Sequence, residues 1–409
     1  MTNDKQAIKY LRSPAAIRER CDRIFNLGCQ DKLSHFRVDL TKLDKCADYV
    51  IQVMHEEYPN LLEIPFHSRW RHFEVGNVSR IAELDRTLAG LTPLEKAKVK
   101  FDLAIISVLL DAGAGANWQY YERETEQVFR RSEGLAVASF RMFCQGTFSS
   151  HPVPWQADAK GLQELTPKEL MPGFQVSADN PLVGVEGRLE LLQRLGQVLT
   201  QHPKVFGTEN PRPGNMVNYL LDNDNNQLAA STVLSAVLEG LGEIWPGRLA
   251  IADVNLGDVW IHPSLEGDNQ SGRYVPFHKL SQWLTYSLLE PLQELGLEIT
   301  GLNELTGLSE YRNGGLCLDI GLLEAKYPDI LRDRYPVGSE IIVEWRALTV
   351  SLLDRIAAAI RQKLNLSSAE LPLVKVLQGG TWSAGRRIAS LLREGGVPPI
   401  QIESDGTVF

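Results

Sequence analysis

The chain has 409 residues, of which 44% are hydrophobic, and a formal net charge of -9 at pH 7. Its length and apolar content allow either two domains or one large helical body with a sizeable core. The acidic balance, without any run of five Lys or Arg residues, excludes the basic surface that non-specific nucleic-acid binding needs. We therefore expect no nucleic-acid partner, while small anionic ligands remain open.

The cysteines and the apolar segments indicate the compartment. The five cysteines are odd in number and contain no Cys-x-x-Cys pair, which is typical of reduced thiols inside the cell. No apolar run reaches 18 residues, and the first residues lack a signal-peptide pattern. We expect a cytoplasmic protein that does not enter a membrane.

Apolar residues at helical spacing predict helices in many parts of the chain. Ser13 and Pro14 begin the first helix as a cap and a first-turn proline. Further helices are expected over 40–58, 98–111, 188–199, 228–244 and 341–364. Strand-like runs are few, and the best two, 249–254 and 259–262, are expected to pair as a small hairpin. The fold class is mainly α with a small β element.

Two stretches are less regular. Residues 145–184 are rich in Pro and Gly and are predicted to be a long loop or a domain seam. Residues 66–74 form an aromatic and charged helix in which His67 or Arg69 faces a ligand, or in which the aromatic residues only anchor it. The buried helix over 98–111 carries Asp102 and Asp111, which need partners.

We divide the chain into an N-terminal helical region (1–90), a core (91–365) and a C-terminal segment packed on the core (366–409).

Several familiar cofactor, metal and nucleophile motifs are incomplete or absent in this sequence. The glycines of 113–118 end in Trp118 where a dinucleotide fingerprint needs glycine, and no strand precedes them. The acidic run at 222–226 lacks the glycine and the final carboxylate of a calcium loop, and is interpreted as a polar turn. The histidines of 66–74 do not have zinc-helix spacing. No Walker loop or Gly-x-Ser-x-Gly motif occurs, so we expect neither a metal nor a cofactor.

The most informative stretch is 276–315. It begins with a helix that carries Lys279 beside an apolar face and is expected to stop near Pro291. A glycine-containing hairpin over 299–308 leads to Glu310, Tyr311 and Arg312. The lysine and the carboxylate can meet over one small polar substrate, or can form a salt bridge between two helices. Arg312 is expected to keep Glu310 ionised, because a nearby cation lowers the pKa of a carboxyl group.

Two later features also suit a binding site. Glycines 379 and 380 precede a helix with Arg386 and Arg387 near its start, which suits an anionic group such as phosphate. Both arginines can equally pair with surface acids. Glu344 either lines a pocket or makes a structural pair. The last six residues, 404–409, are expected to turn back onto the body.

The segments 107–115, 276–284, 305–315, 379–386 and 404–409 together resemble the uracil catabolism protein 4 family over nearly the whole chain. The same blocks are more distantly similar to queuosine salvage proteins, which are N-glycosidases with a fold like that of DNA glycosylases. The resemblance implies a helical body of that kind. It also implies a substrate: a pyrimidine ring opened while still attached to ribose leaves a ribosylurea, from which urea must be released.

These inferences give one site hypothesis. We expect Glu310 to be the cation stabiliser or base and Lys279 to be the acid or a sugar clamp in N-glycosidic cleavage of ribosylurea, mainly as its 5′-phosphate. The side chains expected to bind the ribosyl substrate are His278, Trp283, Tyr311, Arg312, Asp319, Glu344, Trp382 and Arg386. An amidohydrolase acting on the ureido carbon and a non-catalytic nucleoside-binding protein are the alternatives. The oligomeric state stays open.

Overall fold

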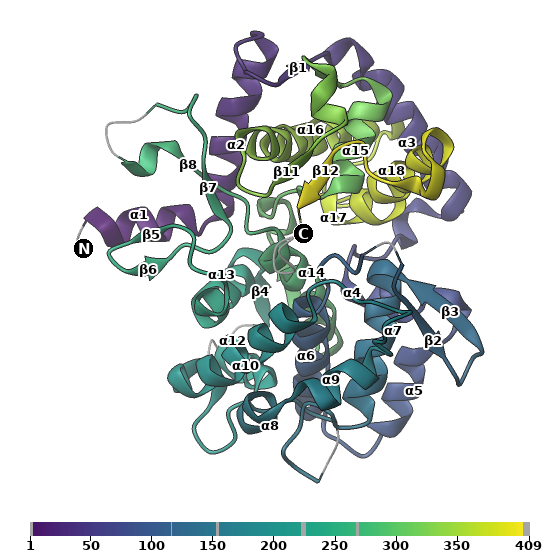
Figure 1. The fold of residues 1–409 in the computed structure, drawn as a ribbon, viewed down its shortest axis with the longest axis vertical. Helices are drawn as coiled ribbons and strands as arrows, with labels where there is room; N and C mark the ends of the chain where they lie inside the picture. Colours follow the sequence, from purple (N-terminus) through teal and green to yellow (C-terminus); the bar gives the residue numbers. More distant parts are fainter. Residues whose placement is uncertain (1–2, 116, 153–154, 222–225, 267–269, 404–409) are drawn as a thin grey trace. The chain divides into compact units, whose positions relative to one another are not determined.

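The computed structural model describes residues 3–115, 117–152, 155–221, 226–266 and 270–403. Helices dominate it, and within the described ranges the strands pair only two at a time (Figure 1). The mainly α fold with a small β element is confirmed. Among the described residues no helix is both long and apolar enough to cross a membrane.

Two compact units account for the packing, and each takes segments from several parts of the chain. The first unit contains Met1–His67, Arg248–Gln282 and Gly301–Glu403, and the second contains Ser68–Gly247 and Trp283–Thr300. The segments 1–90, 91–365 and 366–409 stay a predicted division, since the compact units group the chain differently.

The first unit is built around its longest helix, which packs against α2, α3 and α15 (Figure 1). Its helices are α1 (Asn3–Leu11), α2 (Pro14–Cys29), α3 (Leu43–Glu57), α15 (Tyr311–Ile320), α16 (Glu340–Leu364), α17 (Leu373–Val376) and α18 (Trp382–Leu392), with the first turn of α14 (Lys279–Glu294). Its strands are β1 (Phe36–Val38), β5 (Ala250–Ile251), β6 (Val254–Asn255), β7 (Val259–Ile261), β8 (Tyr274–Pro276), β10 (Leu323–Ala325), β11 (Arg334–Pro336) and β12 (Gln401–Glu403). They pair as β1–β10, β5–β6, β7–β8 and, in parallel, β11–β12.

The second unit is built around the buried helix α6 (Pro93–Leu109) and contains most of α14. Its other elements are α4 (Arg69–Phe73), α5 (Arg80–Thr87), α7 (Arg131–Cys144), α8 (Ala159–Glu164), α9 (Pro167–Gly173), α10 (Val185–Gln201), α11 (Pro203–Phe206), α12 (Met216–Leu221), α13 (Ala230–Leu241), β2 (Gln119–Glu122), β3 (Gln127–Arg130), β4 (Gln227–Ala229) and β9 (Glu298–Thr300). The partners expected for Asp102 of α6 and for Asp111, two residues beyond its end, are present: Arg212 binds Asp102, and Arg69 lies 3.2 Å from Asp111.

Both predicted hairpins are wrong in their pairing. The strands near 249–262 exist, but β5 pairs with β6, while β7 pairs with β8, the strand that leads into the lysine helix. The stretch predicted as a hairpin over 299–308 instead gives β9, which pairs in parallel with β4. A short apolar run satisfies its backbone groups with any available strand edge, so local pattern alone did not identify the partner.

The helix that carries Lys279, α14, was expected to stop near Pro291. It continues through this proline to Glu294. A proline inside a helix cannot donate to the carbonyl four residues earlier, which here belongs to Ser287. That carbonyl accepts instead from the indole Nε1 of Trp70 at 2.7 Å. Because the freed acceptor has a new donor, the helix tolerates its proline.

The predicted loop over 145–184 contains α8 and α9. Asp158 caps α8 by accepting from the backbone N–H of Gly161 at 2.9 Å. Thr166 and Glu169 form a reciprocal capping box at the start of α9. The Thr-Pro-Lys-Glu sequence of 166–169 carries this signal, and the composition of the stretch obscured it. The predicted turns at 222–226 and 404–409 lie mostly or wholly outside the described residues.

Candidate active site

Lys279 begins α14, and its position depends on Asp258. The carboxylate of Asp258 accepts the backbone N–H of Lys279 at 3.0 Å and the indole N–H of Trp260 at 2.6 Å. Two nitrogens of Arg346 each donate to it at 2.8 Å. Burial alone would raise the pKa of Asp258, but the Arg346 charge and these hydrogen bonds hold it well below its usual range. A fixed anion therefore caps the lysine helix.

The segment leading to Glu310 is held against α14 by a second set of polar contacts. Gln282 accepts the backbone N–H of Thr306 at 2.9 Å and donates to its hydroxyl at 2.6 Å. Arg346 donates from Nε to the hydroxyl of Ser309 at 3.2 Å. Arg346 thus contacts both the residue that caps the lysine helix and the residue before Glu310. These contacts bring Lys279 and Glu310 into one region of the first unit.

Glu310 is the N-cap of α15. Its two carboxylate oxygens accept the backbone N–H groups of Arg312 at 2.7 Å and Asn313 at 2.6 Å. Burial raises the pKa of Glu310, and this effect exceeds the lowering by those bonds and by the charges of Arg312 and Lys279. The expected effect of Arg312 is present, but the net direction is opposite to the expectation, because the carboxyl group is desolvated. The Lys279 charge acts on Glu310, so the pair lies within electrostatic reach.

Aromatic rings and guanidinium groups continue the cluster beyond Glu310. The Cζ atom of Arg312 lies 5.3 Å from the ring centroids of both Tyr311 and Trp382. The Cζ atom of Arg386 lies 5.7 Å from the Trp382 ring, and the His67 ring lies 5.8 Å from it. Of the predicted residues, the structure groups Lys279, Glu310, Tyr311, Arg312, Trp382 and Arg386.

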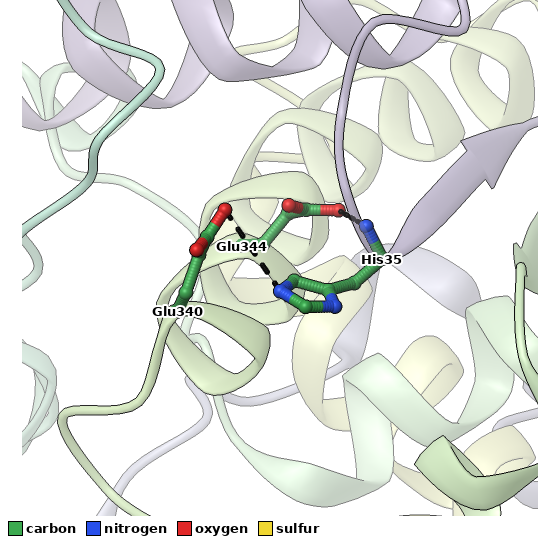
Figure 2. Close-up of side chains that lie close together, drawn as sticks. All are labelled: His35, Glu340 and Glu344. Atoms are coloured by element: carbon green, nitrogen blue, oxygen red, sulfur yellow. Dashed lines mark hydrogen bonds and ion pairs between the residues drawn. The ribbon is translucent and has the colours of Figure 1, made fainter.

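The other four predicted residues have different surroundings. His278 is buried, and its Nε2 lies 2.9 Å from the carbonyl oxygen of Leu11. Asp319, near the opposite end of α15 from Glu310, accepts two bonds from Arg393 at 2.7 and 2.6 Å. Trp283 belongs to the second unit, where its ring faces Arg69 and His72. Glu344 belongs to a separate polar cluster of the first unit (Figure 2).

Glycines 379 and 380 do not form the expected anion-binding loop before a helix. Residues Leu377–Thr381 are a π-helical turn that joins α17 to α18 without a break. A Cβ atom on Gly379 would lie 2.8 Å from Ile64, and one on Gly380 would lie 2.7 Å from Val50. The glycines therefore permit close packing within the protein. Because Arg386 is one turn into a continuous helix, no free helix start lies beside it.

A buried polar cluster in the second unit was not predicted from the sequence. The fully buried Arg69 donates from Nε to the hydroxyl of Ser107 at 2.7 Å and lies 3.2 Å from Asp111. The hydroxyl of Ser132 donates to Asp111 at 2.5 Å. Asp111 was identified as needing a partner, but Ser107 and Ser132 carried no visible signal, because a serine in a helix gives no indication of its contacts.

Comparison with known proteins identifies the family. A family model described as "Protein of unknown function (DUF1688)" matches residues 10–409. The chain is 38% identical to "Uracil catabolism protein 4" of Lachancea kluyveri over 437 residues, covering 98% of this chain and 99% of the relative. It is 40% identical to "Protein urg3" of Schizosaccharomyces pombe (strain 972 / ATCC 24843) over 414 residues, covering 99% of both. The resemblance seen in the motifs is confirmed, and the chain belongs to the uracil catabolism protein 4 family.

Proposed function

We propose that this protein acts in uracil catabolism as a hydrolase that cleaves the N-glycosidic bond of ribosylurea, with the 5′-phosphate as the preferred form. The products are urea and ribose or ribose phosphate. The name of the Lachancea kluyveri relative supports the pathway. The observation that supports the reaction is that Gln282 and Arg346 hold the Glu310 segment beside the start of α14. The charge of Lys279 there acts on the buried carboxyl group of Glu310.

The proposed chemistry follows from these two groups. Breaking the C–N bond places positive charge on the ribose ring, and an ionised Glu310 stabilises that charge or accepts a proton from the attacking water. The water oxygen bonds to the anomeric carbon, and urea departs with a proton. Lys279 supplies that proton or holds a sugar hydroxyl. The raised pKa makes the Glu310 carboxylate a stronger base than an exposed glutamate.

Glu310→Gln tests the catalytic assignment. The amide keeps the shape, and its one oxygen can still accept one of the two N–H groups at the start of α15, so the variant should fold and bind ribosylurea. Loss of the charge should slow turnover by at least about 100-fold. Glu304→Gln, which removes an exposed carboxylate from the same segment, is the matched control. Near-normal turnover by Glu310→Gln would show that the carboxylate is only a helix cap.

Lys279→Met and product analysis complete the test. The lysine variant should also be severely slowed, with some loss of substrate binding. Urea together with ribose or its phosphate identifies an N-glycosidase. Ammonia and carbon dioxide would identify the amidohydrolase alternative, and the absence of turnover would support a binding protein.

The preference for a phosphorylated substrate rests on Arg386. Its side chain is exposed and lies over Trp382, where a guanidinium group can make charge-assisted hydrogen bonds to phosphate. Arg386→Ala should raise KM strongly for ribosylurea 5′-phosphate and hardly for ribosylurea. Arg387, which pairs with Glu56, provides the control variant Arg387→Ala. Equal effects of Arg386→Ala on the two substrates would exclude the phosphate assignment.

A further inference from the structure

A second polar cluster of the first unit has the composition of a metal site. His35 lies just before β1, while Glu340 and Glu344 stand one helical turn apart at the start of α16. One potential ligand atom from each residue lies within 4.8 Å of the other two. The Nε2 atom of His35 lies 3.8 Å from a carboxylate oxygen of Glu340. Figure 2 shows the three side chains converging from the loop and the helix.

Glu344 is fixed in orientation by the backbone. Its Oε1 accepts the N–H groups of His35 at 3.1 Å and Phe36 at 2.7 Å. Two bonds to one oxygen determine where the other oxygen points. Such bonding of a carboxylate ligand by surrounding groups is usual around protein-bound metals.

The second oxygen of Glu344 provides an independent observation. Glu344 is fully buried, yet its Oε2 has no hydrogen-bond partner among the residues that the structure describes. His262 Nε2 lies 3.6 Å away, is also fully buried, and likewise has no such partner within those residues. A buried carboxylate oxygen without a hydrogen bond has lost its contact with water and gained nothing in return, which destabilises the fold. A bound cation would remove this cost.

His262 lies beside the cluster but is not one of its ligands. Its Nδ1 accepts the backbone N–H of Ser264 at 3.2 Å. In the neutral ring the proton therefore resides on Nε2, which then lacks the lone pair that a metal needs. That nitrogen lies 3.6 Å from Glu344 Oε2, which is too far for a hydrogen bond. The ligand set thus consists of one imidazole and two carboxylates.

We propose that His35, Glu340 and Glu344 bind one divalent transition-metal ion of the Zn²⁺ type. An imidazole nitrogen favours such an ion over Mg²⁺ or Ca²⁺, which prefer oxygen ligands. A tetrahedral ion with bonds of about 2.1 Å holds its ligand atoms about 3.4 Å apart, so the side chains must close in by roughly 1 Å. His35 and Glu340 are only partly buried and can do so by rotation. Three protein ligands leave a position for water.

This site is independent of the proposed N-glycosidase function. It also differs from the expectation of no metal, for a clear reason. His35 and Glu344 are 309 positions apart, so no local spacing motif connects them. Only the packing of the segment just before β1 against α16 brings the ligands together.

Titration of Zn²⁺ into the chelator-treated full chain tests the proposal. Isothermal calorimetry should show one ion bound per chain, and the bound ion should raise Tm. His35→Gln and Glu340→Gln should each weaken binding at least about tenfold, since changing even a residue that only hydrogen-bonds to a metal ligand costs about 10–100-fold. His55→Gln and Glu394→Gln, which alter exposed residues of the same types, should bind as the unaltered protein does.

The remaining outcomes are decisive as well. Zn²⁺ binding that is absent, or unchanged in His35→Gln and Glu340→Gln, would overturn the site. Equal binding of Mg²⁺ would overturn the assignment to a transition metal. Glu344→Gln is the weaker test, because the same side chain holds the segment just before β1. The two partly exposed positions allow a result even if that variant does not fold.

Discussion

Asp258 connects the lysine helix to the interior of the first unit through a buried ion pair with Arg346. The exposed fractions of the two side chains are 14% and 1%. Asp258→Asn leaves the Arg346 charge buried without its counter-ion, so we expect the free energy of unfolding to fall by about 3–5 kcal/mol. Urea denaturation measures this change. Asp258→Asn should also slow turnover, because the Asp258 carboxylate caps the helical turn that positions Lys279.

Asp329→Asn is the matched control for that prediction. Asp329 pairs with Arg332, and both side chains are about three-quarters exposed. Losing such a pair costs roughly 0–1 kcal/mol. If Asp258→Asn were no more destabilising than this control, the buried pair would not hold the site together.

His67 should make the protein less stable in mild acid. Burial lowers the pKa of His67 from 6.5 to about 4. The folded state therefore binds this proton less readily than the unfolded state, and stability present above pH 6.5 is lost as the pH falls towards 4. The full loss from this group is about 3 kcal/mol, at about 1.4 kcal/mol per pKa unit.

Unfolding free energies measured between pH 7 and 4 would check this. His67→Gln should flatten the curve in that window, since glutamine does not titrate there. His55→Gln, at an exposed position, should leave the slope unchanged. An unaltered slope in the His67 variant would assign the acid sensitivity to other groups.

The sequence allowed Lys279 and Glu310 to be proposed as partners, and the structure places them near each other. No sequence pattern, however, identified the residues that position Lys279 and Glu310. Asp258 stood in a short polar connection, and Gln282 and Thr306 are ordinary residues of a helix and a loop. Their roles depend on contacts between segments that are distant in the chain. The catalytic and binding roles themselves stay predictions.

At the scale of elements, long helices were predictable because their apolar residues recur at a regular spacing. The helix expected over 341–364 is α16, Glu340–Leu364. Short elements were not predictable in this way. A three-residue strand such as β9 has no period of its own, and its pairing with β4 depends on where the chain brings it.

The packing of α15 against α18 depends on one glycine. A Cβ atom on Gly385 would lie 2.3 Å from the carbonyl oxygen of Arg312. That neighbour is backbone and cannot turn away, so Gly385→Ala should force the helices apart and destabilise the protein by about 1–3 kcal/mol. Since Arg312 lies in the first turn of α15, two residues after Glu310, turnover should fall as well. Thermal unfolding and a kinetic assay would measure the two effects.

Gly90→Ala provides the control, because among the described residues no atom beyond Gly90 and its chain neighbours lies within 4 Å of the added Cβ atom. It should leave Tm unchanged or raise it slightly, as replacement of an unstrained glycine often does. Equal Tm values for the two variants would mean that α15 and α18 can separate without cost.

At the scale of the whole molecule, the division into compact units was not predictable from composition. No proline-rich linker or charge run marks the places where the chain leaves one unit and enters the other. The boundary at 282–283 lies inside the continuous helix α14. A sequence pattern that is helical on both sides of such a boundary gives no signal of it.

Because each compact unit takes segments from several parts of the chain, the structure predicts how the chain responds to truncation. Removing the residues after 365 deletes α17, α18 and β12, which contact α15, α16 and β11 within the first unit. The apolar faces left behind become exposed, so the shortened chain should lose the cooperative unfolding transition of the first unit. Calorimetry and limited proteolysis would detect this. A cooperative transition like that of the full chain would instead support an independent core over 91–365.

The parallel pairing of β11 with β12 also has a consequence for biosynthesis. A ribosome releases β11 long before β12, and the first unit cannot close that pair until residues 401–403 have emerged. The second unit meets the same delay, since β4 must wait for β9. During translation both units thus expose unpaired strand edges and apolar surface, which invite aggregation. Nascent chains of this protein should therefore depend on chaperones more than those of helical proteins whose neighbouring segments pack in order.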